Sequence, residues 1–252
     1  MPRILITGCS SGFGLATAEM FLQKGWHVIA TMRTPRSGLL RDHERLDILE
    51  LDVTRADSIA RAVEKAGPVD ALVNNAGVGM LNVLEGTDLE KARELFETNV
   101  LGAMAVTKAI LPQFRARRSG VIVNVSSSVT LKPLPALSVY SASKAAMNAF
   151  SESLALEAAL FGVRVRLVLP GSAPDTSFGK NAVARMGMDV PEHYGDFVHS
   201  YLKELRASSE VTQAQDVAQA VWHAVADADA PMRIPAGADA KSWFREAACR
   251  ID

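Results

Sequence analysis

The chain has 252 residues, of which 48% are hydrophobic and 22% are charged, and its formal net charge is −1. These values are typical of a globular protein with a sizeable core, and they argue against a disordered chain or a strongly basic nucleic-acid-binding one. The two cysteines, Cys9 and Cys249, make no disulfide framework, so we expect a cytoplasmic location. We predict no membrane span and no bound metal, because no apolar run is long enough and the histidines lack zinc-site spacing.

Short apolar runs alternate with longer helical patterns along the chain. Runs rich in Val, Ile and Leu without polar alternation indicate strands buried on both faces, as in a parallel sheet. We expect strands at 3–7, 27–31, 47–51, 71–75, 120–126, 163–169 and 232–235, and helices near 13–24, 54–66, 88–116, 136–161 and 212–228. This alternation predicts a single α/β domain over 1–252, a Rossmann-type doubly wound fold. Its seven-stranded sheet is expected to be mostly or wholly parallel, with helices on both faces.

The stretch TGCSSGFG at residues 7–14 follows the first predicted strand and opens the first helix. Its glycines suit a tight turn, a close approach of the backbone to a pyrophosphate, and close packing of helix on strand. The amino end of the helix would present N–H groups and a partial positive charge to the phosphates. The turn predicts a dinucleotide site with contacts from Gly8, Ser10, Ser11, Gly12, Phe13 and Gly14.

Two further segments that follow strands are candidates for cofactor contacts. Asp52, in LDV at 51–53, has a carboxylate suited to an adenine amino group, but its surroundings also read as a helix start. The small residues of NNAG at 74–77 would let the backbone approach a ligand, with a plain turn as the alternative. The contacts expected here are Asp52, Val53, Asn75, Ala76 and Gly77.

The second strand runs into HVIATMRTPRSG, residues 27–38, where an NAD site usually carries an acid. Met32 stands there instead, so no carboxylate repels a 2′-phosphate. Arg33 follows with a planar, charged guanidinium suited to phosphate. We therefore predict NADP(H) in preference to NAD(H), with Arg33 as the phosphate contact and help from Arg36. The alternative is that Arg33 is only a solvated surface side chain.

YSASK places Tyr140 and Lys144 at i and i+4, on one helical face. Ser127 stands at the end of the fifth predicted strand. Because a nearby ammonium lowers a tyrosine pKa from its usual ~10, we expect Tyr140 to be the general acid/base and Ser127 to hold the substrate oxygen. Asn99 lies inside a predicted helix, where asparagine is unfavourable, so it is either an exposed polar residue or part of a local bulge.

Together these residues resemble the short-chain dehydrogenase/reductase family, in its branch of roughly 250 residues, over nearly the whole chain. The resemblance rests on TGxxxGxG at 7–14, Asp52, NNAG at 74–77, Asn99, a serine thirteen residues before YxxxK, and PG at 170–171. It implies a catalytic tetrad of Asn99, Ser127, Tyr140 and Lys144. In the family the asparagine holds a water that relays protons to the lysine, and the lysine binds the nicotinamide ribose. Ser126 and Ser128 remain alternatives to Ser127.

The resemblance also implies cofactor contacts from Pro170 and Gly171. Many members have a threonine five residues past this proline, where its hydroxyl meets the nicotinamide carboxamide. Here Asp175 occupies that place and Thr176 follows it. We name Thr176 as the contact after a one-residue shift, and Asp175 remains the alternative.

TGCSSGFG, VIATMR and RIPAGADA (233–240) resemble a group that acts on steroids, retinoids and other bulky apolar alcohols and ketones. The irregular stretch 172–210, rich in aromatic residues and methionine, is expected to be a substrate lid at the carboxyl edge of the sheet. The alternative is a surface excursion with its own small core.

The expected function is an NADP(H)-dependent oxidoreductase that moves a hydride between nicotinamide and a small-molecule carbonyl or secondary alcohol. A nucleotide sensor or scaffold without turnover is one alternative. A sugar-nucleotide epimerase-like enzyme, which also uses YxxxK, is another. Helices 88–116 and 140–161 carry small apolar faces, and the resemblance implies that they form the interface of a homodimer or homotetramer. The alternative is ordinary packing of these faces on the sheet.

Overall fold

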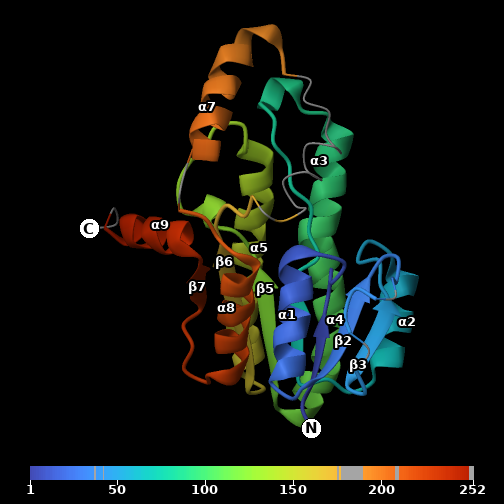
Figure 1. Cartoon of the computed structure of the whole chain (residues 1–252). Coiled ribbons are helices and arrows are strands. Elements are labelled where there is room, and N and C mark those ends of the chain that lie inside the picture. Colours follow the sequence, from blue (N-terminus) through green and yellow to red (C-terminus); the bar gives the residue numbers. More distant parts are fainter. Residues whose placement is uncertain (37, 42, 175, 177–189, 208–209, 250–252) are drawn as a thin grey trace.

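The computed structural model describes residues 1–36, 38–41, 43–174, 176, 190–207 and 210–249. Seven strands form one sheet in the order β3-β2-β1-β4-β5-β6-β7, and every neighbouring pair is parallel. The strands are β1 (Arg3–Ile6), β2 (His27–Met32), β3 (Leu46–Glu50), β4 (Ala71–Asn74), β5 (Gly120–Val125), β6 (Val163–Pro170) and β7 (Arg233–Ala236). The predicted fold class is confirmed, and the sheet is wholly parallel (Figure 1).

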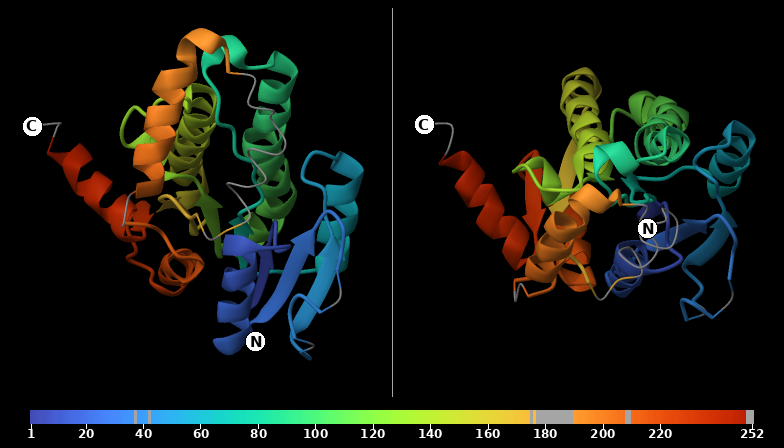
Figure 2. Two further views of the ribbon diagram at one scale, coloured as in Figure 1. Left: turned by 45° about the horizontal axis from the view of Figure 1, so that its top comes forward. Right: turned by 90° about the horizontal axis from the view of Figure 1, so that it is seen from above.

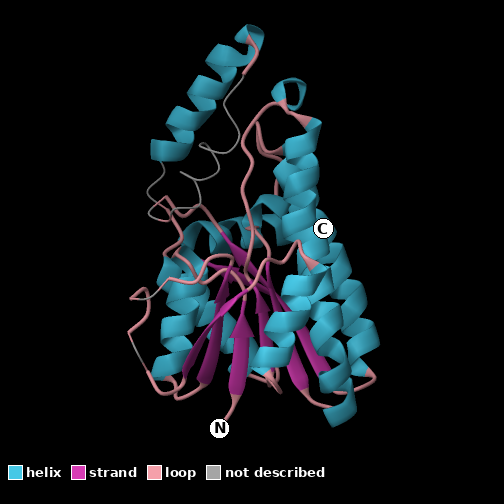
Figure 3. Ribbon diagram, turned by 90° about the vertical axis from the view of Figure 1, so that its right-hand side faces the viewer, coloured by secondary structure: helices cyan, strands magenta, loops and turns pink. Residues whose placement is uncertain are grey.

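Helices cover both faces of the sheet (Figures 2 and 3). The α-helices are α1 (Gly12–Gln23), α2 (Ala56–Ala66), α3 (Leu89–Phe96), α4 (Ala103–Arg117), α5 (Ser138–Ala159), α7 (Gly195–Ala207), α8 (Ala214–Ala226) and α9 (Ala238–Ala248). Short 3-10 turns are η1 (Leu84–Gly86), η3 (Ser128–Thr130) and η4 (Glu192–Tyr194), and η2 (Glu97–Gly102) is a π-helical turn.

Alternate strand residues face two separate hydrophobic layers, as the period of a strand requires. Ile4 and Ile6 pack in one cluster with residues of α1 and α8. Leu5, between them, packs in the other cluster with residues of α2, α4 and α5. Because both faces of each central strand are covered, the strands read as continuous apolar runs in the sequence.

Three segments differ from the sequence-based expectation. The helix expected over 88–116 is divided into α3 and α4 by the π-helical turn η2, so the structure supports the local bulge, one of the two alternatives for Asn99. The stretch 172–210, expected to be irregular, contains the helix α7. Helix α9 follows β7 and was not expected at all. Residues 177–189 of the expected lid, including Phe178, lie outside the described part of the chain.

The carboxyl ends of the strands meet at one edge, above which α7 stands (Figure 1). The strand order reverses direction between β1 and β4, and ligands of open α/β sheets bind in the crevice at such a switch point. The glycine-rich turn follows β1 and NNAG follows β4, so both border this crevice. Within the described residues, no helix combines the length and the apolar character needed to cross a membrane.

Candidate active site

The glycine-rich turn between β1 and α1 requires its glycines. Gly8 and Gly12 have φ values of 75° and 56°, in the left-handed region that favours glycine. A Cβ on Gly14 would lie 2.3 Å from the carbonyl oxygen of Gly8. Ser11, the residue before α1, makes no side-chain cap, so the first N–H groups of the helix are not satisfied by it. This cradle of close backbone and helix N–H groups fits the phosphates of a dinucleotide.

The segment after β4 braces this turn. The hydroxyl of Thr7 accepts hydrogen bonds from the backbone N–H groups of Asn75 (3.0 Å) and Ala76 (2.9 Å). The side-chain amide of Asn75 donates to the carbonyl oxygens of Thr7 (2.9 Å) and Gly8 (3.1 Å). The Asn75 amide is therefore engaged with the protein, and Thr7, which the sequence reasoning did not select, is the residue that joins the two loops.

At the end of β2 the side chain of Met32 is buried, whereas that of Arg33, the next residue, is exposed. Met32 is only 2% exposed and belongs to the core cluster beneath α1. Arg33 is exposed, and no hydrogen bond or ion pair with another described residue occupies its guanidinium. The position that carries an acid in NAD sites is therefore filled here by a core side chain, and Arg33 is the charged group at the strand end.

Asp52 stabilises its own turn. Its Oδ1 accepts hydrogen bonds from the backbone N–H (3.0 Å) and the hydroxyl (2.8 Å) of Thr54. Asp52 is not the helix cap that its surroundings suggest, because the residue before α2 is Arg55. Val53 is 8% exposed and packs against Gly102 of η2, where a Cβ would come within 2.7 Å of Val53 Cγ2. The turn after β3 is thereby held against the π-helical turn.

Ser127 and Tyr140 meet at the carboxyl end of β5. Each is 7% exposed, and a side-chain hydrogen bond joins them. Burial raises the pKa of Tyr140 above its usual value, and the hydrogen bond with Ser127 acts in the opposite direction. Ser126 has a different hydrogen-bond partner, because its Oγ donates to Oδ1 of Asn148 at 2.6 Å. Of the three adjacent serines, Ser127 is the one that the structure joins to Tyr140.

Lys144 is buried below Tyr140 on the same face of α5. Its Nζ donates to the carbonyl oxygen of Val125 at 3.0 Å and lies 5.9 Å from the centroid of the Tyr140 ring. Burial lowers the pKa of Lys144 to about 8. A Cβ on Gly77 would lie 3.7 Å from this Nζ and 3.2 Å from Oδ1 of Asn99, so the loop after β4 closes over both side chains.

Asn99 is 1% exposed in the π-helical turn. Its Oδ1 accepts from the N–H of Val78 at 2.8 Å, and its Nδ2 donates to the carbonyl oxygen of Val78 at 2.9 Å. Nδ2 also lies 3.3 Å from Oγ of Ser143 on α5. The alternative of an exposed polar residue is wrong, because the side chain fixes the loop after NNAG.

The buried amine of Lys144 predicts a pH-dependent stability. Its pKa is about 8 in the folded protein and 10.5 as an unperturbed group. Between these values the unfolded chain binds more protons, so the free energy of unfolding rises as the pH rises. We expect wild type to gain about 2 kcal/mol relative to Lys144→Met between pH 8 and 10. Urea unfolding at each pH measures the difference, and a difference that stays constant over this range would contradict the burial of a protonatable amine.

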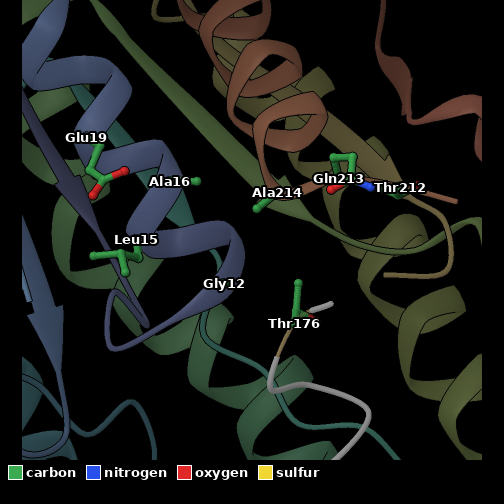
Figure 4. Close-up of a pocket in the computed structure, with 8 residues that line it drawn as sticks. All are labelled: Gly12, Leu15, Ala16, Glu19, Thr176, Thr212, Gln213 and Ala214. Carbon is green, nitrogen blue, oxygen red and sulfur yellow. The ribbon is translucent and has the colours of Figure 1, made fainter. Parts of the chain in front are cut away.

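Thr176 approaches the glycine turn from the segment after β6. It is 9% exposed, and its hydroxyl donates to the carbonyl oxygen of Ala173 at 2.8 Å. A Cβ built on Gly12 would lie 3.6 Å from Cβ of Thr176. The two residues border a cavity of about 270 Å³ (Figure 4), which is lined by Gly12, Leu15, Ala16, Glu19, Thr176, Thr212, Gln213 and Ala214. Asp175, the alternative to Thr176, lies outside the described residues.

The fold and this site are those of a nucleotide-binding α/β oxidoreductase, and comparison with known proteins gives the family. A family model described as short chain dehydrogenase matches residues 2–186. The chain therefore belongs to the short-chain dehydrogenase family. Among curated relatives, retinol dehydrogenase 8 of Bos taurus is 36% identical, with 92% of this chain and 80% of the relative covered. A 3-ketodihydrosphingosine reductase of Bacteroides thetaiotaomicron is 34% identical, with 96% and 92% covered.

Solved structures agree with this assignment. A short-chain dehydrogenase from Streptomyces avermitilis has a TM-score of 0.83 and 32% identity, with 100% of this chain and 94% of that chain covered. A short-chain dehydrogenase from Burkholderia cenocepacia in complex with NADP has a TM-score of 0.77 and 28% identity, with 98% and 92% covered. A further family structure, from Burkholderia phymatum, is a complex with NAD, at TM-score 0.82 and 22% identity, with 99% and 92% covered. The fold alone therefore does not decide between the two cofactors.

Proposed function

We propose that this oxidoreductase moves a hydride between NADP(H) and an apolar ketone or secondary alcohol, with Tyr140 as the general acid/base. The observation that carries the proposal is the hydrogen bond between Ser127 and Tyr140, with the amine of Lys144 buried beside them. The proposed cofactor contacts are Gly8, Ser10, Ser11, Gly12, Phe13, Gly14, Arg33, Asp52, Val53, Asn75, Ala76, Gly77, Tyr140, Lys144, Pro170, Gly171 and Thr176.

We propose that residues of this chain transfer the proton to and from the substrate oxygen. The nicotinamide, when bound, supplies the hydride in reduction and accepts it in oxidation. In reduction Tyr140 donates its hydroxyl proton to the substrate oxygen, and burial keeps that proton on the phenol until it is needed. Ser127 hydrogen-bonds the same oxygen as negative charge develops on it. In oxidation Tyr140 accepts the proton, and the ammonium of Lys144 favours the phenolate that this requires.

Asn99 and Lys144 are proposed to connect Tyr140 to solvent, as the family resemblance implies. The two side chains approach each other beside Gly77. A Cβ built on Gly77 would lie 3.2 Å from Oδ1 of Asn99 and 3.7 Å from Nζ of Lys144. The side chain of Asn99 is occupied by Val78, so its backbone carbonyl in the π-helical turn is the proposed water ligand.

Arg33 is proposed to select the phosphorylated cofactor. A hydrogen bond to a charged group is worth about 1.5–3 kcal/mol, which corresponds to roughly a 10- to 150-fold change in affinity. Arg33→Ala should therefore weaken NADPH binding by at least about tenfold and leave NADH binding nearly unchanged. Cofactor titration by fluorescence measures both affinities, with Arg115→Ala, which removes an exposed arginine of α4 outside the proposed cofactor contacts, as the control.

Equal losses for NADPH and NADH in Arg33→Ala would contradict this assignment. Replacing Met32 by an acid is a poor test of cofactor choice, because Met32 is 2% exposed in the core and a carboxylate there would be buried. The cofactor ratio should therefore be tested at Arg33 alone.

An apolar substrate is supported by two observations. The relatives named above are a retinol dehydrogenase and a 3-ketodihydrosphingosine reductase. In this chain a hydrogen bond between Tyr194 and Glu85 joins η4 to η1. Leu84 of η1 and Phe197 of α7, the helix that follows η4, are 64% and 55% exposed. Apolar side chains on either side of that contact suit the entry of an apolar molecule above the carboxyl edge of the sheet.

Absorbance of NADPH at saturating protein, over a panel of apolar ketones, tests the proposed reaction. We expect turnover of at least one bulky apolar ketone. Tight NADPH binding without turnover across the panel would instead favour a nucleotide sensor that has lost its chemistry. Turnover restricted to sugar nucleotides would favour the epimerase-like alternative.

The assembly and location are also proposals. Leu156 of α5 and Leu160, the residue that follows this helix, are 78% and 70% exposed, and Leu101 in η2 is 48% exposed. Such apolar exposure on the helices that build family interfaces supports a homodimer or homotetramer. Cys9 and Cys249 are both free thiols, which supports a cytoplasmic location.

A further inference from the structure

Asp239, in the first turn of α9, is a buried carboxylate with three hydrogen-bond partners. It is 3% exposed. Its Oδ2 accepts from the backbone N–H of Ser172 at 2.6 Å, and its Oδ1 accepts from the backbone N–H of Ala240 at 2.8 Å. The hydroxyl of Thr212 lies 2.7 Å from Oδ1. A buried carboxylate is costly unless it is hydrogen-bonded in this way, so the site has been built around the charge.

Thr212 completes a compact arrangement around Asp239, which we call the Asp239 clasp: Gly171, Ser172, Thr212 and Asp239. The backbone N–H of Thr212 donates to the carbonyl oxygen of Ser172 at 2.7 Å. The backbone N–H of Gly171 donates to the hydroxyl of Thr212 at 2.9 Å. The chain that leaves β6 at Ser172 and the chain that returns at Thr212 before α8 are therefore fastened to the same carboxylate.

The clasp leaves no room for side chains at the positions that surround it. A Cβ on Gly171 would lie 2.1 Å from the carboxylate oxygens of Asp239. A Cβ on Gly237 would lie 2.0 Å from the hydroxyl of Thr212, and Gly237 has a φ of 96°. These glycines therefore allow RIPAGADA to approach the PG turn, and the approach puts Asp239 beside Ser172.

The clasp fixes the position of Ser172, from which the chain runs to Thr176 beside the glycine-rich turn. Only three residues separate Ser172 from Thr176, and Thr176 is folded back onto the carbonyl oxygen of Ala173 through its N–H (3.1 Å) and hydroxyl (2.8 Å). Thr176 in turn lies beside Gly12. A shift at Ser172 would thus be transmitted to Thr176 and to the proposed cofactor contacts at Pro170 and Gly171.

We propose that Asp239 is a positioning residue for the half of the cofactor that carries the nicotinamide. It acts through Gly171, Ser172 and Thr212, and it touches neither substrate nor cofactor. This inference rests on the proposed function, because it assumes that NADP(H) binds along the edge from Arg33 to Gly171. The adenosine half of the cofactor, which is proposed to lie near Arg33, should be independent of the clasp.

The charge state of the side chain is essential to this role. All three partners of Asp239 can donate, and a carboxylate has acceptor positions for all of them. An amide of the same shape has one acceptor oxygen and an NH₂ group that only donates. In Asp239→Asn the NH₂ group must therefore face either the N–H of Ser172 or the N–H of Ala240 and the hydroxyl of Thr212. Two donors then face each other in either orientation, and the segment from Gly171 to Thr176 must move.

The test compares binding of NADPH with binding of 2′,5′-ADP, which contains only the adenosine half, by calorimetry. In Asp239→Asn we expect NADPH to bind at least tenfold more weakly and 2′,5′-ADP to bind within twofold of wild type. The matched control is Asp216→Asn, which alters the exposed cap of α8, where Asp216 accepts from the N–H of Gln213 at 2.8 Å. The control should leave both affinities unchanged.

A second pair of variants keeps the test decisive if Asp239→Asn folds poorly. Thr212→Val removes the hydroxyl at the centre of the clasp and should lower NADPH affinity selectively, whereas Thr212→Ser keeps the hydroxyl and should restore it. Unchanged NADPH binding in Asp239→Asn or Thr212→Val would overturn the inference, as would equal losses for NADPH and 2′,5′-ADP. Failure of the wild-type protein to bind NADPH would instead overturn the proposed function.

Discussion

Tyr140→Phe should lower kcat by about 10³-fold and leave the affinity for NADPH within twofold of wild type. General acid/base groups contribute about 10²–10⁴ to rate, and phenylalanine lacks the hydroxyl that hydrogen-bonds Ser127 and is proposed to donate the proton. The ring of Tyr140 packs with Met80 and Leu95, and phenylalanine preserves that packing. The variant should therefore fold normally and lose only the chemical step. Single-turnover kinetics measure that step, and a separate binding measurement gives the affinity for NADPH.

Tyr194→Phe is the matched control for this substitution. Its hydroxyl bonds Glu85, far along the chain from α5, and its loss should change kcat less than twofold. If Tyr140→Phe reduced kcat by less than tenfold, Tyr140 would not be the proton donor and the proposed mechanism would fail.

Gly14→Ala should have the largest effect on cofactor binding. The added Cβ would lie 2.3 Å from the carbonyl oxygen of Gly8 and 2.5 Å from Nδ2 of Asn75. Those atoms belong to the glycine turn and to its brace from NNAG, so the turn must move. We expect a loss of about 2–3 kcal/mol in the free energy of unfolding, as overpacking usually costs. We also expect NADPH to bind at least about 100-fold more weakly. Urea unfolding and fluorescence titration give the two values.

Gly195→Ala provides the control for a glycine-to-alanine change. Gly195 has a helical φ of −53°, and apart from its chain neighbours and its own helix backbone, no described residue has an atom within 4 Å of the position that its Cβ would take. This variant should be neutral or more stable by up to about 1 kcal/mol, with unchanged cofactor affinity. Wild-type NADPH binding by Gly14→Ala would show that the turn is not the phosphate cradle.

The sheet was predictable because its strands are buried on both faces, which leaves a strong apolar signal in runs such as that of β2. The interruption at Asn99 was predictable for a local reason, since asparagine competes for backbone hydrogen bonds inside a helix. Both features depend on residues close together in the sequence. The pairing of Tyr140 with Lys144 is local in the same way, because both lie on one face of α5.

Features that depend on distant contacts were missed. Asp239 looks like an ordinary acid in a short helix, and nothing near it reveals that Ser172 and Thr212, 67 and 27 residues away, donate to it. Met32 was expected at the ligand-facing end of β2, but the alternation of the strand turns its side chain into the core. Asn75 was selected as a cofactor contact, and the structure uses its side chain to brace the glycine turn.

Transfer of deuterium from NADPH labelled at nicotinamide C4 tests the central claim most directly. Wild-type protein, labelled NADPH and a panel of bulky apolar ketones are incubated, and the alcohols are analysed by mass spectrometry. The account predicts one deuterium on the carbinol carbon of at least one product, at a rate reduced about 10³-fold in Tyr140→Phe. Bound NADPH with no deuterated alcohol from any ketone in the panel would contradict it, and so would transfer at the wild-type rate in Tyr140→Phe.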